Sequence, residues 1–133
     1  MRLVLSLLLG LHGAIHLLGF VKGLGLAAVP QLQLAISTRV GVAWLVAALL
    51  LMGSSVLVFV APRVWWMVAL PGVLLSQLLI IGAWQDAKFG TLANVVLLVP
   101  LVIVIADLRP SSLRSRFTRD TASLLAAEKS MHS

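Results

Sequence analysis

Four long apolar stretches dominate this sequence and constrain its fold more than any other feature. Each is a continuous run of apolar residues rather than an alternation of apolar and polar positions, which favours helix over strand. A helix that crosses a bilayer needs about 17–25 such residues, and in lipid only helices and closed barrels satisfy their own backbone hydrogen bonds. The sequence therefore predicts transmembrane helices over residues 3–21, 40–60, 64–83 and 91–106.

The composition points in the same direction. The hydrophobic fraction of the 133 residues is 61% and the charged fraction is 11%, whereas soluble domains are about half apolar and about a quarter charged. We expect an all-α integral membrane protein with a four-helix transmembrane domain over residues 1–107. The first segment begins like a signal peptide, but its apolar run continues to Val21, so we expect an uncleaved helix.

Loop lengths and basic residues predict the topology. The connection at residues 61–63 is so short that the helices on either side of it must form an antiparallel hairpin, and residues 84–90 are expected to be a short loop as well. Seven basic residues fall on one side of the membrane, namely Arg2, Arg63 and five in the tail, and three fall on the other, namely Lys22, Arg39 and Lys88. Because basic loops stay in the cytoplasm, we expect an antiparallel up-down bundle with both termini cytoplasmic.

The tail, residues 108–133, is the most basic part of a chain whose net charge is +6. This charge suits contact with anionic lipid headgroups. A nucleic-acid partner is not expected, because no nucleic-acid-binding motif accompanies the charge. Two interpretations of the tail are open: a short surface helix that contains Leu113 and Phe117, or a mobile basic segment.

Two histidines interrupt the first apolar segment. His12 and His16 are four residues apart, so they share one helix face, and the same face continues through Gly19 and Gly23. Glycines let a neighbouring helix approach closely, so we expect this face to point into the bundle. A buried imidazole needs a hydrogen-bonding partner. The candidate partners are Gln77, Asn94, Ser54, Ser55, a backbone carbonyl near Pro71 and, for His16, Asp86.

Most of the other intramembrane polar residues gather toward the outer ends of the predicted helices. The candidate ligand-binding residues are His12, His16, Gln77, Trp84, Asp86, Lys88 and Asn94. Asp86 is interpreted either as an ordinary interfacial ion pair or loop cap, or as the partner of Lys22 or Arg39 that pins the long first loop over the site. Within that loop, residues 32–36 are a candidate amphipathic piece at the membrane surface. Trp44 is expected in the outer aromatic belt.

The histidine cluster admits a structural interpretation and a ligand-binding one. In the first, its side chains form hydrogen bonds between helices. In the second, His16 and Asn94 contact the polar head of a quinone while Trp84 or Phe20 contacts its ring.

Metal binding and proton transfer are less well supported by the sequence. A pair of histidines at this spacing can ligate a metal or haem, but the zinc-protease motif requires a glutamate after the first histidine, where this chain has Gly13. A proton relay lacks acidic residues beyond Asp86 and Asp107. No nucleophile constellation or nucleotide-binding motif occurs, so we assign neither catalytic residues nor a metal site.

Three stretches of the chain resemble a group of small bacterial membrane proteins with a DoxX-like arrangement of four helices. They are "HGAIHLLGF", "GLGLAAVPQL" and "LSQLLIIGAWQDAKFGTLANVVLL", and the resemblance covers about residues 9–107. It implies a location in the bacterial cytoplasmic (inner) membrane. Because DoxX-type proteins include a membrane subunit of a quinone-reducing thiosulfate oxidoreductase, it also implies a quinone as the cofactor to consider. The group itself has no assigned biochemical role.

The sequence thus predicts a multi-pass membrane protein that acts as an accessory or small-ligand-binding subunit rather than as an enzyme. Two alternatives are a quinone-linked redox component and a carrier of lipids or small molecules. Membrane lipid is the expected partner, and either a membrane protein partner or a homo-oligomer is compatible with the sequence.

Overall fold

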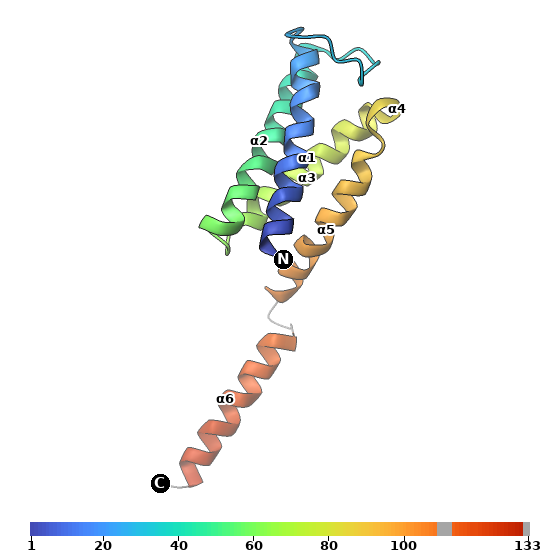
Figure 1. Cartoon of the computed structure of the whole chain (residues 1–133). Coiled ribbons are helices and arrows are strands. Elements are labelled where there is room, and N and C mark those ends of the chain that lie inside the picture. The colour runs from blue at the N-terminus through green and yellow to red at the C-terminus, as the bar shows by residue number, and fades with distance from the viewer. Residues whose placement is uncertain (109–112, 132–133) are drawn as a thin grey trace. The chain divides into compact units, whose positions relative to one another are not determined.

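The computed structural model describes residues 1–108 and 113–131, and every regular element in these ranges is a helix (Figure 1). The helices in chain order are α1 (Arg2–Gly23), α2 (Thr38–Val60), α3 (Trp65–Gly82), α4 (Trp84–Ala87), α5 (Gly90–Asp107) and α6 (Leu113–Met131). The chain divides into two compact units, Met1–Leu101 and Val102–Ser133, and the boundary between them falls within α5.

Four of the described helices, α1, α2, α3 and α5, are long and apolar enough to cross a membrane. They contain 18 to 23 residues, and the mean hydropathy of their most apolar windows is 1.8 to 2.4. Between 17% and 33% of each window is buried inside the protein, so most large apolar side chains, such as Leu7 and Leu78, face outward. Lipid is the solvent that such a surface requires. The prediction of four helices of membrane-spanning length is confirmed, and the structure indicates a membrane protein.

Small residues let α1 and α2 pack closely. The buried positions of α1 are Leu9, His12, Gly13, His16, Gly19 and Gly23. A Cβ atom at Gly23 would lie 2.5 Å from the Cα of Gly41, and one at Gly13 would lie 3.0 Å from the carbonyl oxygen of Ala48. The backbones of the two helices can approach this closely only because α1 carries glycine at these positions. The predicted inward face from His12 to Gly23 is therefore confirmed.

A reciprocal pair of serines also joins α1 to α2. The Oγ of Ser6 donates to the carbonyl of Ser55 at 2.9 Å, and the Oγ of Ser55 donates to the carbonyl of Ser6 at 2.8 Å. The neighbouring Ser54 donates to the carbonyl of Leu50 in its own helix at 2.6 Å. Ser54 and Ser55 were candidate partners of the histidines, and the structure gives both hydroxyls other partners.

The first connection, between α1 and α2, begins with a C-terminal helix cap at Gly25. This residue has a φ of 66°, and the amide groups of Gly25 and Leu26 donate to the carbonyls of Lys22 and Val21, each at 3.0 Å. The pattern is a Schellman motif, which ends a helix where glycine adopts the left-handed conformation. Residues 32–36, the predicted amphipathic piece, are irregular rather than helical. The connection ends at Ser37, whose hydroxyl accepts from the Val40 amide.

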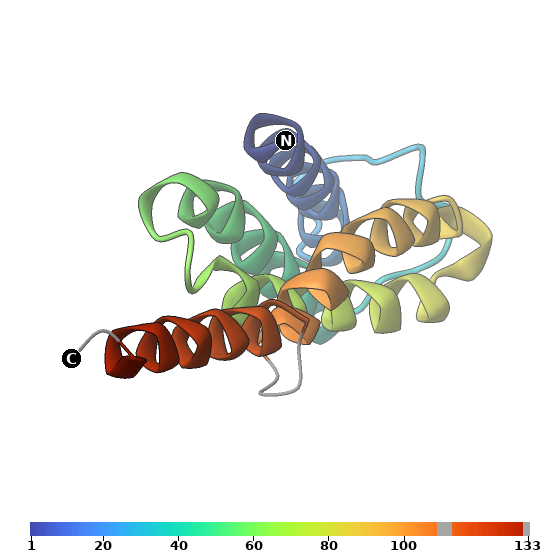
Figure 2. The same ribbon diagram turned by 90° about the horizontal axis from the view of Figure 1, so that it is seen from below.

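A single helical turn, α4, links α3 to α5, where the sequence predicted only a short loop. The carbonyl of Ala83 accepts from the amides of Asp86 at 3.0 Å and Ala87 at 2.9 Å, which closes this turn. In Figure 2 the yellow-green α3 and the orange α5 both lead away from this yellow turn. The turn places Asp86 and Ala87 in the wall of a pocket.

The second unit contains the end of α5 and the tail helix α6. Of the two interpretations of the tail, the structure has the helix, and its 19 residues make it longer than the short surface helix expected. From Arg116 to Met131 its side chains are exposed, including the large apolar residues Phe117, Leu124 and Leu125.

Candidate functional site

His12 connects three helices through one ring nitrogen. Its Nε2 lies 2.9 Å from the Oδ1 of Asn94 on α5 and 3.1 Å from the Oγ of Ser76 on α3. Because an amide oxygen can only accept, Nε2 carries the ring proton and donates it to Asn94. All three side chains are buried. His12 therefore acts as an interhelical hydrogen-bond donor that fixes α1 against α3 and α5.

Asn94 is the hub of this network. Its Nδ2 donates to the Oγ of Ser76 and to the Oε1 of Gln77, each at 3.0 Å. The Nε2 of Gln77 in turn donates to the Oγ1 of Thr91 at 3.2 Å, which returns the network to α5. Of the predicted site residues, His12, Gln77 and Asn94 are thus brought together, and both ends of the Asn94 amide are used within the protein.

His16 lies one helical turn further along α1, and its ring proton is on the other nitrogen. Its Nδ1 lies 3.0 Å from the carbonyl oxygen of His12, and because that oxygen only accepts, Nδ1 carries the ring proton. In a neutral imidazole the Nε2 atom then presents a lone pair. The residue is 1% exposed, and Nε2 has no hydrogen-bond partner among the described residues. Since buried polar atoms are nearly always paired, this acceptor calls for an explanation.

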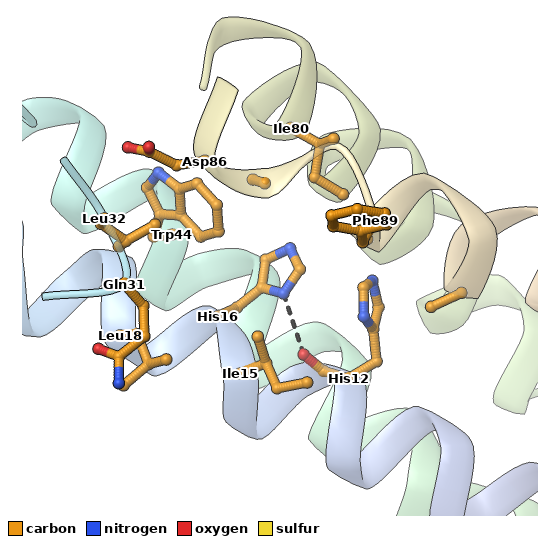
Figure 3. Close-up of a pocket in the computed structure, with 13 residues that line it drawn as sticks. His12, Ile15, His16, Leu18, Gln31, Leu32, Trp44, Ile80, Asp86 and Phe89 are labelled. Carbon is orange, nitrogen blue, oxygen red and sulfur yellow. Dashed lines mark hydrogen bonds between the residues drawn. The ribbon is translucent and has the colours of Figure 1, made fainter. Parts of the chain in front are cut away.

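A pocket of about 300 Å³ lies beside His16 (Figure 3). Its lining comes from α1, α2, α3, α4, α5 and the first connection, and it consists of His12, Ile15, His16, Leu18, Gln31, Leu32, Trp44, Ile80, Asp86, Ala87, Phe89, Gly90 and Ala93. Figure 3 shows the rings of Trp44, His16, His12 and Phe89 arranged around the same space. A mostly apolar wall with a few polar groups is typical of small-molecule sites, and this volume is at their lower limit.

Trp44 forms one wall of the pocket rather than part of the outer aromatic belt, so that prediction is wrong. The residue is 3% exposed, and its ring centroid lies 4.9 Å from that of His16. The space for the indole comes from Gly19, where a Cβ atom would lie 2.2 Å from the Cδ2 of Trp44. The glycine on the facing helix thus makes room for an indole whose burial removes a large apolar area from solvent.

Two side chains hold the first connection next to the pocket. The Oδ2 of Asp86 accepts from the amide of Leu34 at 2.7 Å, and the Nζ of Lys22 donates to the carbonyl of Leu32. Of the two interpretations of Asp86, the structure has the one in which this residue pins the loop. The expected mechanism, an ion pair with Lys22 or Arg39, was wrong, because both tethering side chains bond to backbone groups of the loop.

Three of the other predicted residues, Trp84, Lys88 and Phe20, lie outside the lining of the pocket. Trp84 is half exposed, and the Nζ of Lys88 lies 5.6 Å from the centroid of the Phe89 ring. Phe20, a candidate for ring contact with a quinone, is also outside the lining. Asp86 is a lining residue, whereas Asn94 and Gln77 lie behind the wall in the hydrogen-bonded network.

Several residues of the site were not predicted. Ser76 belongs to a buried stripe of α3 at helical spacing, which also contains Ala69, Gly72, Val73 and Ile80, and that stripe is the signal that could have identified it. Trp44 could have been found from the glycine opposite it. Gln31 and Leu32 are in an irregular segment, where no periodicity indicates which side chains point inward.

Comparison with known proteins gives no family for this chain, so the site is interpreted from its geometry. No protein-family model, curated protein or solved structure matches the chain. The described residues contain no group of three or more histidine, cysteine or acidic side chains that could hold a metal ion. What the site offers is an apolar pocket, two aromatic walls and one buried imidazole acceptor.

Proposed function

We propose that this chain is a multi-pass protein of the bacterial cytoplasmic membrane that binds a small neutral molecule in the pocket beside His16. One observation carries the proposal: His16 belongs to the wall of a pocket, and its Nε2 acceptor is buried there and is not paired within the described residues. A buried polar atom of this kind is costly unless something occupies the site and bonds to it. The role is that of an accessory or ligand-binding subunit rather than of an enzyme.

The proposal includes an arrangement in the membrane. The four spanning helices form an antiparallel bundle with both termini in the cytoplasm, which is supported by the excess of arginine and lysine on that side. The pocket then opens toward the outer half of the bilayer. The resemblance to DoxX-like proteins is part of this proposal and rests on the three sequence stretches that carry it.

The two histidines divide the structural and ligand-binding roles between them. His12 donates to Asn94 and so holds three helices together. His16 belongs to the wall of the pocket, and its Nδ1 is bonded to the His12 carbonyl, which fixes the ring. A ring held in one tautomer and one orientation is a suitable ligand-binding group, because binding then requires little reorganisation.

The test is to identify what the purified protein carries. The full chain is extracted from bacterial membranes in mild detergent, and native mass spectrometry measures the mass bound to it. We expect a small molecule on the wild type and on Gly53→Ala, a control far from any side-chain contact in the described structure. We expect its loss from His16→Phe, which removes the acceptor but keeps a ring, and from Ala93→Trp, which fills the pocket.

Two outcomes would overturn the proposal. One is a mass spectrum in which the wild-type chain has only its own mass, without a bound small molecule. The other is an equal load on the wild type and on Ala93→Trp, because a molecule that survives a filled pocket is bound elsewhere. Far-UV circular dichroism of each variant, which reports helix content, identifies any substitution that prevents folding.

A quinone-linked redox component is the second candidate. The specific observation in its favour is the pair of aromatic walls, Trp44 and Phe89, on either side of the pocket. A flat ring packs well against such walls. An ultraviolet difference spectrum of the extracted small molecules, recorded before and after chemical reduction, shows whether a quinone is among them, and a spectrum without that change rejects this candidate.

A further inference from the structure

We infer that the ligand of this pocket is a neutral hydrogen-bond donor, an apolar molecule with one hydroxyl group on an aromatic ring, which donates to the Nε2 of His16. The inference rests on the proposed ligand-binding function and deepens it. It follows from the proton position on one ring, from the surroundings of that ring and from the shape of the pocket.

The proton position comes first. The Nδ1 of His16 is 3.0 Å from the carbonyl oxygen of His12, and a carbonyl oxygen has no proton to give. The Nδ1 atom must therefore be the donor in this bond, which leaves Nε2 as an acceptor in the neutral ring. Because the bond lies within one helical turn of α1, it is retained whether or not the pocket is occupied.

The surroundings of His16 favour the neutral ring. Its neighbours in the pocket wall are apolar except for His12, Gln31 and Asp86. Asp86 is used by the Leu34 amide, and His12 is a second imidazole, with its ring centroid at 4.7 Å. A positive charge on His16 would thus be buried without a direct counter-charge, which is strongly unfavourable. The pocket therefore presents an acceptor rather than a cation.

An acceptor in an apolar pocket discriminates among ligands by their hydrogen-bonding groups. Alcohols and phenols satisfy it through their hydroxyl proton. Ketones, esters and quinones carry only acceptors, so they would leave Nε2 buried without a hydrogen bond. A reduced, hydroxyl-bearing ring is therefore expected to bind more tightly than the corresponding oxidised ring.

The shape of the pocket favours a single aromatic ring. Trp44 and Phe89 supply two aromatic surfaces, and the ring centroid of Trp44 is 4.9 Å from that of His16. A ring that donates to Nε2 would thus also contact the indole. The volume of about 300 Å³ suits one ring with a short apolar substituent rather than a large cofactor.

The test compares two probes that differ only in whether the phenolic oxygen carries a hydrogen or a methyl group. 4-Propylphenol can donate a hydrogen bond, whereas its methyl ether, 4-propylanisole, cannot. Both are titrated into the full chain in lipid nanodiscs, with isothermal calorimetry as the readout. For each protein we take the Kd of the ether divided by the Kd of the phenol. We expect this ratio to be about tenfold larger in the wild type than in His16→Phe. Because both chains are in the same lipid, partitioning of the probes cancels in this comparison.

The variant His16→Gln keeps the test informative if the phenylalanine variant folds poorly. The glutamine amide oxygen can occupy a position close to that of Nε2, so it should preserve the preference for the phenol. The inference is overturned if the ether binds the wild type as well as the phenol does, or if the preference persists in His16→Phe.

Failure of the inference and failure of the proposed function give different results. If the ether or a quinone binds more tightly than the phenol, and Ala93→Trp abolishes that binding, the pocket is a ligand site and only the donor chemistry is wrong. If neither probe binds the wild type, or if Ala93→Trp leaves binding unchanged, both the pocket function and the inference are rejected.

Discussion

The imidazole rings of His12 and His16 meet edge to face, with centroids 4.7 Å apart and planes at 73°. Their hydrogen-bonding states are opposite. The Nε2 of His12 donates to Asn94 across 82 positions of sequence, whereas the Nε2 of His16, in the wall of the pocket, is an acceptor with no partner among the described residues. The link between them is the His12 carbonyl, which fixes the proton of His16 on Nδ1. The His12 side chain thus holds the helices together, while its backbone carbonyl determines the tautomer of His16.

This relationship predicts that the hub of the network contributes to stability. Asn94→Leu removes the acceptor of His12 and the donor to Gln77, and leaves buried polar groups unpaired. The free energy of unfolding should fall by about 1–3 kcal/mol. The lower end is favoured, because interhelical hydrogen bonds in membrane proteins average about 0.6 kcal/mol each and Asn94 makes such bonds to His12, Ser76 and Gln77. The measurement is unfolding in mixed micelles of rising dodecyl sulfate content, followed by circular dichroism.

Ser54→Ala is the matched control for that measurement. Ser54 is as buried as Asn94, but its hydroxyl donates only within α2, to the carbonyl of Leu50. Its removal should change stability by a few tenths of a kcal/mol, since no second helix loses a partner. Equal effects of the two substitutions would show that the network between helices contributes nothing beyond a local hydrogen bond.

A second prediction concerns the close contact of Gly19 with Trp44. In Gly19→Ala the new Cβ atom would lie 2.2 Å from the indole, so the ring or the helix must move. We expect a loss of about 1–3 kcal/mol in the free energy of unfolding, as for other overpacked cores. The control is Gly53→Ala, where a Cβ atom meets no described atom within 4 Å and the helix should gain about 0.5–1 kcal/mol. Thermal unfolding in detergent compares them, and equal transition temperatures would contradict the tight contact.

The spanning helices were predictable because the signal is local. A continuous apolar run of sufficient length predicts both the helical structure of a segment and its location in a membrane, without any knowledge of tertiary contacts. Such a signal fixes neither the rotation of a helix nor its partners. His12 was therefore assigned several candidate partners at similar depth, and the sequence could not select Asn94 over Ser54 or Ser55. That selection depends on how α3 and α5 turn toward α1.

The errors at Trp44 and Asp86 have a common origin. The aromatic-belt rule considers residue type and depth, so it misses a glycine on the facing helix that makes room for an indole. The ion-pair expectation for Asp86 considered only side chains, whereas the actual partner is the backbone amide of Leu34. Backbone donors in an irregular segment leave no mark in the sequence, although they are as demanding as side chains.

A third prediction addresses the tether between Asp86 and the first connection. Asp86→Ala removes a bond from an amide to a carboxylate, which is worth about 1.5–3 kcal/mol. Hydrogen exchange at the Leu34 amide should accelerate by about tenfold or more. Asp86→Asn retains an acceptor oxygen, so the exchange rate of Leu34 in this variant should lie between the rates in the alanine variant and in the wild type. Gln85→Ala, an exposed neighbour in α4, should leave the exchange rate of Leu34 unchanged. Equal exchange in all four proteins would show that the tether does not form in the membrane.

The last prediction tests the proposed orientation. Alkaline phosphatase folds only outside the cytoplasm, and green fluorescent protein exported in unfolded form does not fluoresce. With both termini inside, phosphatase fused after Ala28 in the first connection should be active, whereas a fusion after Pro62 should be inactive. Green fluorescent protein at the C-terminus should fluoresce. The reason is the excess of seven basic residues over three on the side that contains Arg2 and Arg63. Active phosphatase after Pro62 together with a dark C-terminal fusion would invert the topology and place the His16 pocket in the cytoplasmic half of the bilayer.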